Sequence, residues 1–214
     1  MSAWTEHVSR WKDCQRCSLC AQRDRICLAR GTIPADIVFI GEAPGASEDA
    51  IGQPFVGPAG QLMDAIIASA LRGPLQQTLR IALTNLVACF PRTAKAEGIN
   101  EPHMSEIRKC RPRLVEFVNL CQPRLIVCVG MLATQYIDHG DTVRCADIIH
   151  PAAILRMPLA QKQMATQRAV VTLRNAVEDM LESTQRPYTT WGERHAGKTL
   201  REQLESEYNS AELG

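Results

Sequence analysis

The chain lacks the features that mark membrane and secreted proteins. Its 214 residues contain no apolar run of about eighteen residues, which argues against a membrane span. Residues 1–7 show no apolar core behind a basic flank, so we expect no secretory signal and a cytoplasmic protein without membrane contact. Such a reducing compartment argues against a disulfide framework for the nine cysteines, and metal binding is the first alternative.

The chain also lacks an excess of charge of one sign, and aromatic residues are few. Its 24 Lys and Arg against 23 Asp and Glu give a net charge of +1, which neither requires nor excludes nucleic acid as a partner. With 45% hydrophobic and 22% charged residues, the composition is globular. We expect one domain over residues 1–184, followed by a flexible polar tail over residues 185–214 with one helical turn near residues 200–208.

Short apolar segments alternate with helical patterns along this domain. Four segments fit short buried strands: 35–41, 79–87, 125–130 and 145–149. Helical spacing follows at 61–71, 105–120 and 159–182, with an interruption expected at Pro112. The alternation predicts an α/β fold: a three-layer α/β/α sandwich with a central, mainly parallel four-stranded sheet. Ligands of such sheets bind beyond the carboxyl ends of the strands, which are here Gly41-Glu42, Thr84-Asn85, Gly130 and His150.

The cysteines near the start have the spacing of metal ligands. Cys14, Cys17 and Cys20 give two consecutive Cys-x2-Cys spacings, and thiolates so spaced can turn back onto one metal. Cys20 with Cys27 could complete a zinc site. A ferredoxin-like cluster would instead need cysteines from elsewhere, and Cys89 and Cys110 are candidates at even odds. The remaining cysteines lie in or beside apolar segments, where buried free thiols are expected: Cys121, Cys128 and Cys145.

A glycine-rich loop follows the first strand over residues 41–60. Glycines there let backbone N–H groups approach an anionic or planar ligand closely. The loop lacks the Gly-Lys-Ser ending of a phosphate-binding loop. Its composition alone is equally compatible with an ordinary connecting loop.

Three motifs in this order resemble one known family. Residues 41–60 (Gly-Glu-Ala-Pro-Gly-Ala-Ser-Glu-Asp, then Gly-Gln-Pro-Phe-Val-Gly-Pro-Ala-Gly) closely resemble the first motif of the family 4, iron–sulfur uracil-DNA glycosylases. Residues 84–89 (Thr-Asn-Leu-Val-Ala-Cys) look like its second motif and residues 150–156 (His-Pro-Ala-Ala-Ile-Leu-Arg) like its third. The resemblance runs from about residue 12 to residue 182. It implies a DNA glycosylase with a [4Fe–4S] cluster, held by the cysteines at the family's ligand positions: Cys14, Cys17, Cys89 and Cys110. We expect the protein to be a monomer.

The resemblance also implies roles for the residues of the three motifs. Phe55 would stack on a base flipped out of DNA, and Asn85 would read its edge, within a base site that also includes Gly41, Ala43 and Gly45. Glu42 would position the water that attacks the sugar, and His150 would donate to the departing base. A loop from Pro151 to Arg156 would press into the duplex, with Ile154 or Leu155 as wedge and Arg156 near phosphate. Each residue also has an ordinary structural alternative, and the apolar wedge candidates could equally pack inward.

Two departures from the family pattern leave the substrate open. Where the family typically has Cys-Arg-Pro-Pro and then Asn-Arg-x-Pro, residues 89–102 begin Cys-Phe-Pro-Arg and contain no Asn-Arg-x-Pro sequence, so the DNA contacts of that loop do not carry over. The segment 137–145 is short, which could widen the base pocket. We expect the substrate to be a damaged or modified pyrimidine flipped out of DNA, with uracil as the leading candidate. The alternatives are a bulky modified cytosine in phage DNA and a cluster-bearing DNA-binding module without activity.

Overall fold

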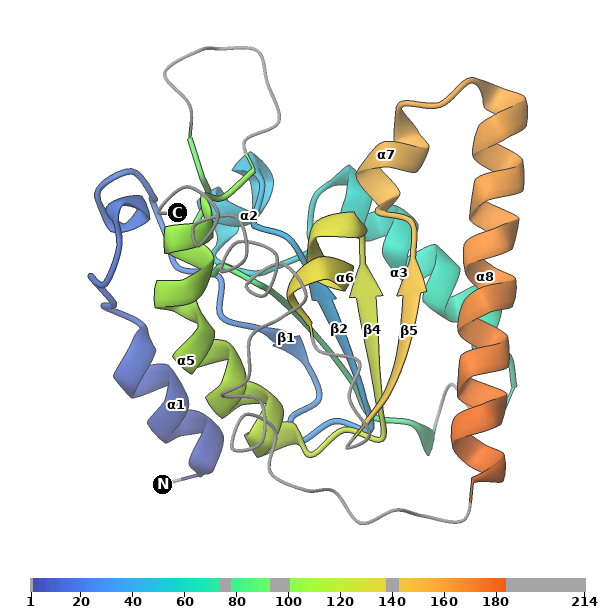
Figure 1. Cartoon of the computed structure of the whole chain (residues 1–214), viewed down its shortest axis with the longest axis horizontal. Helices are drawn as coiled ribbons and strands as arrows, with labels where there is room; N and C mark the ends of the chain where they lie inside the picture. Colours follow the sequence, from blue (N-terminus) through green and yellow to red (C-terminus); the bar gives the residue numbers. More distant parts are fainter. Residues whose placement is uncertain (1, 74–77, 93–100, 138–142, 184–214) are drawn as a thin grey trace, which may run out of the picture.

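A sheet of five strands forms the centre of the computed structural model (Figure 1), which describes residues 2–73, 78–92, 101–137 and 143–183. The strands are β1 (Arg30–Gly31), β2 (Ile37–Gly41), β3 (Ile81–Asn85), β4 (Leu125–Val129) and β5 (Arg144–Ile148), in the spatial order β1-β3-β2-β4-β5. Strands β2 to β5 pair in parallel and β1 is antiparallel to β3. The predicted α/β class is confirmed, and the sheet has one strand more than predicted.

The additional strand, β1, is two residues long and ends at a glycine that its position requires. Gly31 has a φ of +106°, and a Cβ on it would lie 2.2 Å from the carbonyl oxygen of Ile81 on β3. Only a residue without a side chain can pair there. A strand this short leaves no alternation pattern in the sequence, which explains why it was not predicted.

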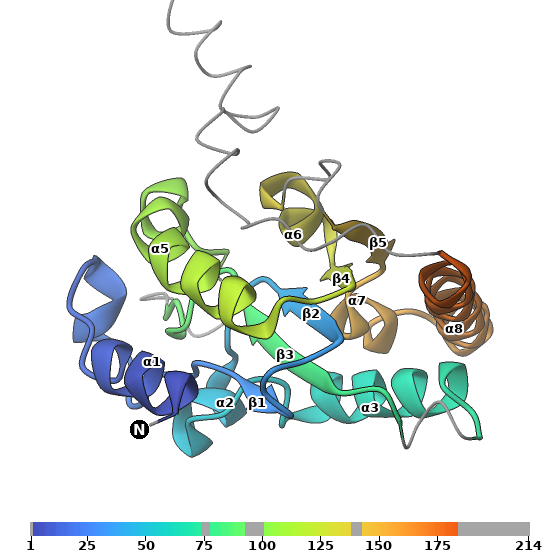
Figure 2. The same ribbon diagram turned by 90° about the horizontal axis from the view of Figure 1, so that it is seen from below.

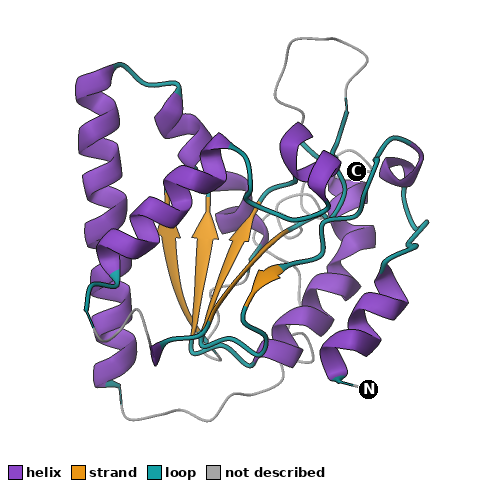
Figure 3. Ribbon diagram, turned by 180° about the vertical axis from the view of Figure 1, so that it is seen from behind, coloured by secondary structure: helices purple, strands orange, loops and turns teal. Residues whose placement is uncertain are grey.

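Helices cover both faces of the sheet, because alternate residues of the central strands are buried on opposite sides. Val38 and Ile40 of β2 belong to the core beneath α5 (Met104–Cys121) and α6 (Met131–Tyr136). Ile37 and Phe39 belong to the core beneath the opposite helices, α3 (Pro58–Ala70), α7 (Pro151–Leu155) and α8 (Leu159–Glu182). Figures 2 and 3 show these two layers on either side of the strands. The predicted three-layer arrangement is confirmed.

The remaining helices lie near the edge formed by β1. Helix α1 (Ala3–Trp11) packs along α5, a short 3-10 turn covers Ser18–Ala21, and α2 (Ala46–Ile51) follows the loop after β2 (Figure 1). Within the described part of the chain, none of the helices is both long and apolar enough to cross a membrane. The predicted tail 185–214, residues 93–100 of the altered loop and residues 138–142 of the short segment lie outside the described residues.

Candidate active site

A pocket of about 260 Å³ opens beyond the carboxyl ends of the parallel strands. Such a volume is below the roughly 300–1,000 Å³ of pockets for drug-sized ligands and suits a single flat ring. Six of the residues predicted for the base and the chemistry line it: Glu42, Ala43, Gly45, Phe55, Asn85 and His150. Arg156, predicted as a phosphate contact, lines it as well. Parallel pairing brings them together, because it places the ends of β2, β3, β4 and β5 at one edge of the sheet.

Gly41 and Asn85 are register partners at the ends of β2 and β3. A Cβ on Gly41 would lie 2.5 Å from Oδ1 of Asn85 and 2.6 Å from Cζ of Phe55, so the glycine allows the amide and the ring to approach each other. Asn85 is 2% exposed, and its backbone carbonyl accepts a hydrogen bond from the guanidinium of Arg113. Its side-chain amide forms no hydrogen bond within the described part of the chain, which leaves a donor and an acceptor for a ligand.

Phe55 is held in a left-handed backbone conformation, with a φ of +57°. Such a conformation is uncommon for a bulky residue and persists only where the surroundings impose it. Two side chains impose it here. Glu48 accepts hydrogen bonds from the backbone N–H groups of Val56 (3.0 Å) and Gly57 (2.8 Å), and Arg30 donates to the carbonyl oxygen of Phe55 (3.0 Å). The ring is therefore fixed in the pocket before any ligand arrives.

His150 has a fixed tautomer, because one of its ring nitrogens caps a helix. It is the N-cap of α7, and its Nδ1 accepts a hydrogen bond from the backbone N–H of Ala152 at 3.1 Å. The ring proton must then be on Nε2, which makes Nε2 a donor. Burial lowers the pKa of His150 to about 4, with a smaller contribution from the positive charge of Arg156. A neutral imidazole thus supplies the donor near pH 7, and its ring stacks with that of Phe55 at 6.4 Å between centroids.

Glu42 lies beside His150, and a glycine again makes the approach possible. A Cβ on Gly130 would be 2.7 Å from Oε1 of Glu42 and 3.0 Å from Cβ of His150. Burial raises the pKa of Glu42, as does the charge of Glu101, whereas a hydrogen bond from the backbone N–H of Leu132 opposes the rise. A carboxylate of raised pKa is a better proton acceptor than an ordinary surface carboxylate.

The predicted DNA loop forms the short helix α7, and only part of it is accessible. Ile154 is fully buried and packs in the core beneath α3 and α8, which contradicts its assignment as a wedge. Pro151 is also buried at the first position of the helix, which argues against its contact with DNA. Leu155 is 36% exposed and Arg156 is exposed, so these two residues alone among the four candidates face solvent.

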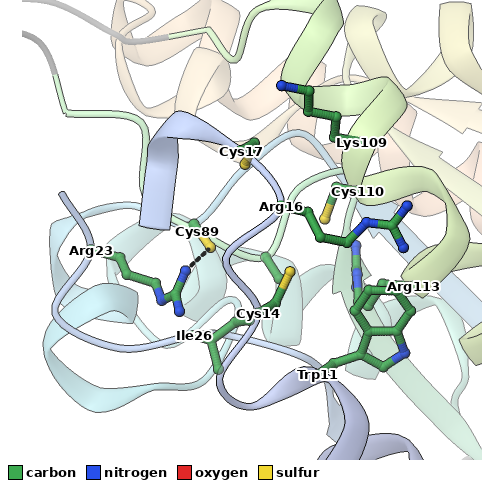
Figure 4. Close-up of a pocket in the computed structure, with 11 residues that line it drawn as sticks. Trp11, Cys14, Arg16, Cys17, Arg23, Ile26, Cys89, Lys109, Cys110 and Arg113 are labelled. Carbon is green, nitrogen blue, oxygen red and sulfur yellow. Dashed lines mark hydrogen bonds between the residues drawn. The ribbon is translucent and has the colours of Figure 1, made fainter. Parts of the chain in front are cut away.

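The four cysteines predicted as cluster ligands line a second cavity, beside α5 (Figure 4). Cys14 and Cys17 come from the segment after α1, Cys89 from the loop after β3 and Cys110 from α5. The other lining residues include four cations, which suit an anionic thiolate-bound cluster: Arg16, Arg23, Lys109 and Arg113. Arg23 donates to Sγ of Cys89 at 3.4 Å. Donor set and charge therefore fit a [4Fe–4S] cluster.

The cavity between these thiols measures about 20 Å³, so the side chains must move apart to admit a cluster. Among the described residues, no three His, Cys, Asp or Glu side chains are arranged to hold a single metal ion. Burial raises the pKa of Cys89 to about 12 and also raises that of Cys17, so metal binding must displace their protons. Cys27, the alternative zinc ligand, does not line this cavity and donates instead to the carbonyl oxygen of Glu48.

Several contributors to the two sites were not predicted from the sequence. Glu48 is the N3 residue of a capping box on α2. That sequence pattern predicts the start of a helix, but it does not predict the hydrogen bonds of Glu48 to the loop that follows Phe55. Phe90 lines the base pocket, and the only sequence feature that could have indicated this is its position directly after Cys89. Arg113 is 1% exposed and donates to four oxygens around the end of β3, and no sequence pattern indicates a buried arginine.

Comparison with known proteins identifies the family of the chain. Residues 29–174, more than half of the chain, match the model of the Uracil DNA glycosylase superfamily. The chain therefore belongs to this superfamily of DNA glycosylases, as the motifs predicted. It is 30% identical over 185 residues to the Type-4 uracil-DNA glycosylase of Archaeoglobus fulgidus, a match that covers 76% of this chain and 88% of that protein. The Type-4 uracil-DNA glycosylase of Pyrobaculum aerophilum is 29% identical over 171 residues, which is 69% of this chain and 82% of the relative.

Proposed function

We propose that the protein removes uracil from DNA by hydrolysing its N-glycosidic bond. The observation that carries the proposal is the convergence of Glu42, Asn85, Phe55 and His150 on one pocket of about 260 Å³. Relatives named Type-4 uracil-DNA glycosylase support the choice of uracil. A base inside a duplex cannot reach such a pocket, so the nucleotide must rotate out of the stack, which costs a few kcal/mol and least at a mispair.

In this proposal the base is recognised by stacking and by its edge. The extruded ring stacks on Phe55, whose position is already fixed by Glu48 and Arg30. Asn85 offers both an amide donor and a carbonyl acceptor, which match the alternating acceptor and donor groups of a uracil edge. Removing one partner of such buried hydrogen bonds leaves the other unpaired, so a base with the wrong edge is rejected.

The chemistry then needs one donor and one acceptor on opposite sides of the breaking bond. As the bond from the sugar C1′ to the base nitrogen breaks, the electron pair leaves with the base, and Nε2–H of His150 donates to the base carbonyl that gains negative charge. Glu42 orients a water toward C1′ and accepts its proton as the new C1′–O bond forms. The products are the free base and an abasic site.

We further propose that Cys14, Cys17, Cys89 and Cys110 hold a [4Fe–4S] cluster with a structural role. The cluster would cross-link the segment after α1, the loop after β3 and helix α5. Thiols must be reduced to ligate iron, which agrees with the cytoplasmic location that we propose. Leu155 and Arg156 are the proposed DNA contacts of α7, and we propose that a monomer acts on one flipped nucleotide.

Single-turnover assays on defined oligonucleotides test this function. The purified protein is incubated with otherwise identical duplexes that contain uracil, thymine, cytosine or a bulky modified cytosine, and abasic sites are detected by alkaline cleavage. We expect release of uracil and not of thymine or cytosine. If the modified cytosine is released faster than uracil, the modified cytosine is the preferred substrate and the proposal of uracil is wrong. Tight DNA binding without release of any base would support the inactive DNA-binding module instead.

A further inference from the structure

Phe90 is a second aromatic side chain in the wall of the base pocket. It lines the same cavity as Glu42, Asn85 and His150, and it is half-buried. Neither the motifs nor the proposed chemistry gives it a role. Because the cavity measures only about 260 Å³, a phenyl ring in its wall bears directly on which bases can enter.

Arg92 holds this ring from outside the pocket. Its guanidinium carbon lies 5.8 Å from the centroid of Phe90, a cation–π distance. The same guanidinium donates to Oδ2 of Asp49 at 2.6 Å and to Asp24. Phe90 is therefore connected through one arginine to two carboxylates.

Asp49 is the firmer of these two anchors. Its side chain is 1% exposed, and its carboxylate also accepts hydrogen bonds from the backbone N–H groups of Asp24 and Arg25 at 3.0–3.2 Å. A buried carboxylate is strongly destabilising once its cation is removed, so Arg92 is kept in place although it is itself 41% exposed.

One short helix, α2, braces both aromatic walls. Its residue Glu48 accepts from the backbone of the loop that follows Phe55, and the next residue, Asp49, pairs with Arg92 behind Phe90. The two rings thus come from distant parts of the chain and are positioned by adjacent carboxylates. Fixed walls make a pocket selective, because a larger base cannot push them aside without breaking these bonds.

We infer that Phe90 is a specificity-determining residue that limits the size of the base admitted, and that Arg92 is its positioning residue. The inference rests on the proposed function, since it concerns the base that the same pocket takes. It predicts that wild-type protein prefers uracil over 5-substituted uracils and over purines. Shape, rather than hydrogen bonding, carries this part of the selection.

The test compares base-release rates for one duplex that carries uracil, 5-bromouracil or hypoxanthine at the same position. Phe90→Ala should raise the rate for each larger base relative to uracil by about 10- to 200-fold. This is the range of discrimination that an apolar pocket achieves against a group that is slightly too large. Arg92→Gln should shift the same ratio in the same direction by less, and Arg92→Lys should restore it in part. Arg80→Gln is the matched control. Arg80 pairs with Asp36 just before the start of β3 and β2, at the opposite edge of the sheet from the pocket.

Lost stability alone would lower all rates together and leave the ratio unchanged. An unchanged ratio in a folded Phe90→Ala protein overturns the inference, and Phe90→Leu replaces that variant if it does not fold. Should wild-type protein release no base at all, the proposed function fails. The inference is then decided by the dissociation constants of the same duplexes: relatively tighter binding of the larger bases by Phe90→Ala supports it, and unchanged relative binding overturns it.

Discussion

Replacing His150 separates its two roles, because the structure gives each ring nitrogen one task. Nδ1 accepts from the N–H of Ala152 and caps α7, whereas Nε2 carries the proton that we propose is donated to the leaving base. His150→Ala removes both functions. His150→Ser keeps an oxygen that can cap the helix, but its side chain is too short to place a donor at the position of Nε2.

The two roles differ in magnitude and in the measurement that reports them. Loss of one donor that stabilises developing charge costs about 3–4 kcal/mol, or roughly 100- to 1,000-fold in rate. Loss of an N-cap costs about 1 kcal/mol of folding stability. We therefore expect the rate of single-turnover uracil release to fall about 100- to 1,000-fold in both variants. Only the Ala variant should also lose about 1 kcal/mol of unfolding free energy, measured by denaturant unfolding.

Rates are measured with enzyme in excess over a uracil-containing duplex, at a temperature where all variants are folded. DNA binding is measured separately by fluorescence anisotropy, and we expect it to be almost unchanged. A His150→Ser protein that releases uracil at the wild-type rate would refute the donor role of Nε2. A Ser variant as inactive as the Ala variant but as stable as wild type would bear out both assignments.

Four further outcomes follow from the same geometry. Asn85→Ala should reduce both the rate of uracil release and the discrimination against cytosine, measured on matched duplexes, because it removes the amide that reads the edge. Cys110→Ser should lose the brown colour and the absorbance near 400 nm and should unfold at a lower temperature than wild type, since cluster binding is coupled to folding; a fully coloured and equally stable variant would contradict the ligand set. Leu155→Ala should weaken activity on duplex more than on single-stranded DNA, whereas Ile154→Ala should lower unfolding stability by about 2–5 kcal/mol because it empties a core position. Because the pKa of His150 is lowered to about 4 in the folded protein, the unfolded state binds this proton more tightly, so the contribution of His150 to stability should be fully present above about pH 6.5 and fall by about 3 kcal/mol towards pH 4. In unfolding curves at several pH values, wild type should therefore lose about 3 kcal/mol more than His150→Ser over this range.

The strand ends that carry the site could be predicted because parallel pairing has few solutions. A short apolar run buried on both faces identifies β2, and parallel strands place their carboxyl ends at one edge. Gly41 and Asn85, 44 positions apart, could thus be expected as neighbours, and they are register partners. Long helices such as α8 were equally predictable, and the structure gives it the predicted bounds, Leu159–Glu182.

Short elements and orientations could not be predicted, because they depend on tertiary packing. Pro112 does not interrupt α5: it removes one hydrogen bond, and the burial of Leu114 and Phe117 beyond it keeps the helix continuous. In a helix of five residues, periodicity cannot tell which face is buried, so Ile154 and Leu155 were equivalent in sequence although one is in the core and the other is exposed. Buried polar groups such as Arg113 also leave no periodic signal.

The segment from Asn85 to Phe90 links the two sites in one short stretch of backbone. Asn85 ends β3 in the base pocket, Cys89 lines the cysteine cavity four residues later, and Phe90 returns to the pocket wall. Arg113 lines the cysteine cavity and at the same time donates to the backbone carbonyls of Asn85 and Leu86. A change in how Cys89 is held must therefore be transmitted to residues on both sides of it, through covalent geometry as well as through this guanidinium. A cluster that takes no part in the chemistry would still set the position of the base reader, because rigid support around a site determines how accurately its groups are placed.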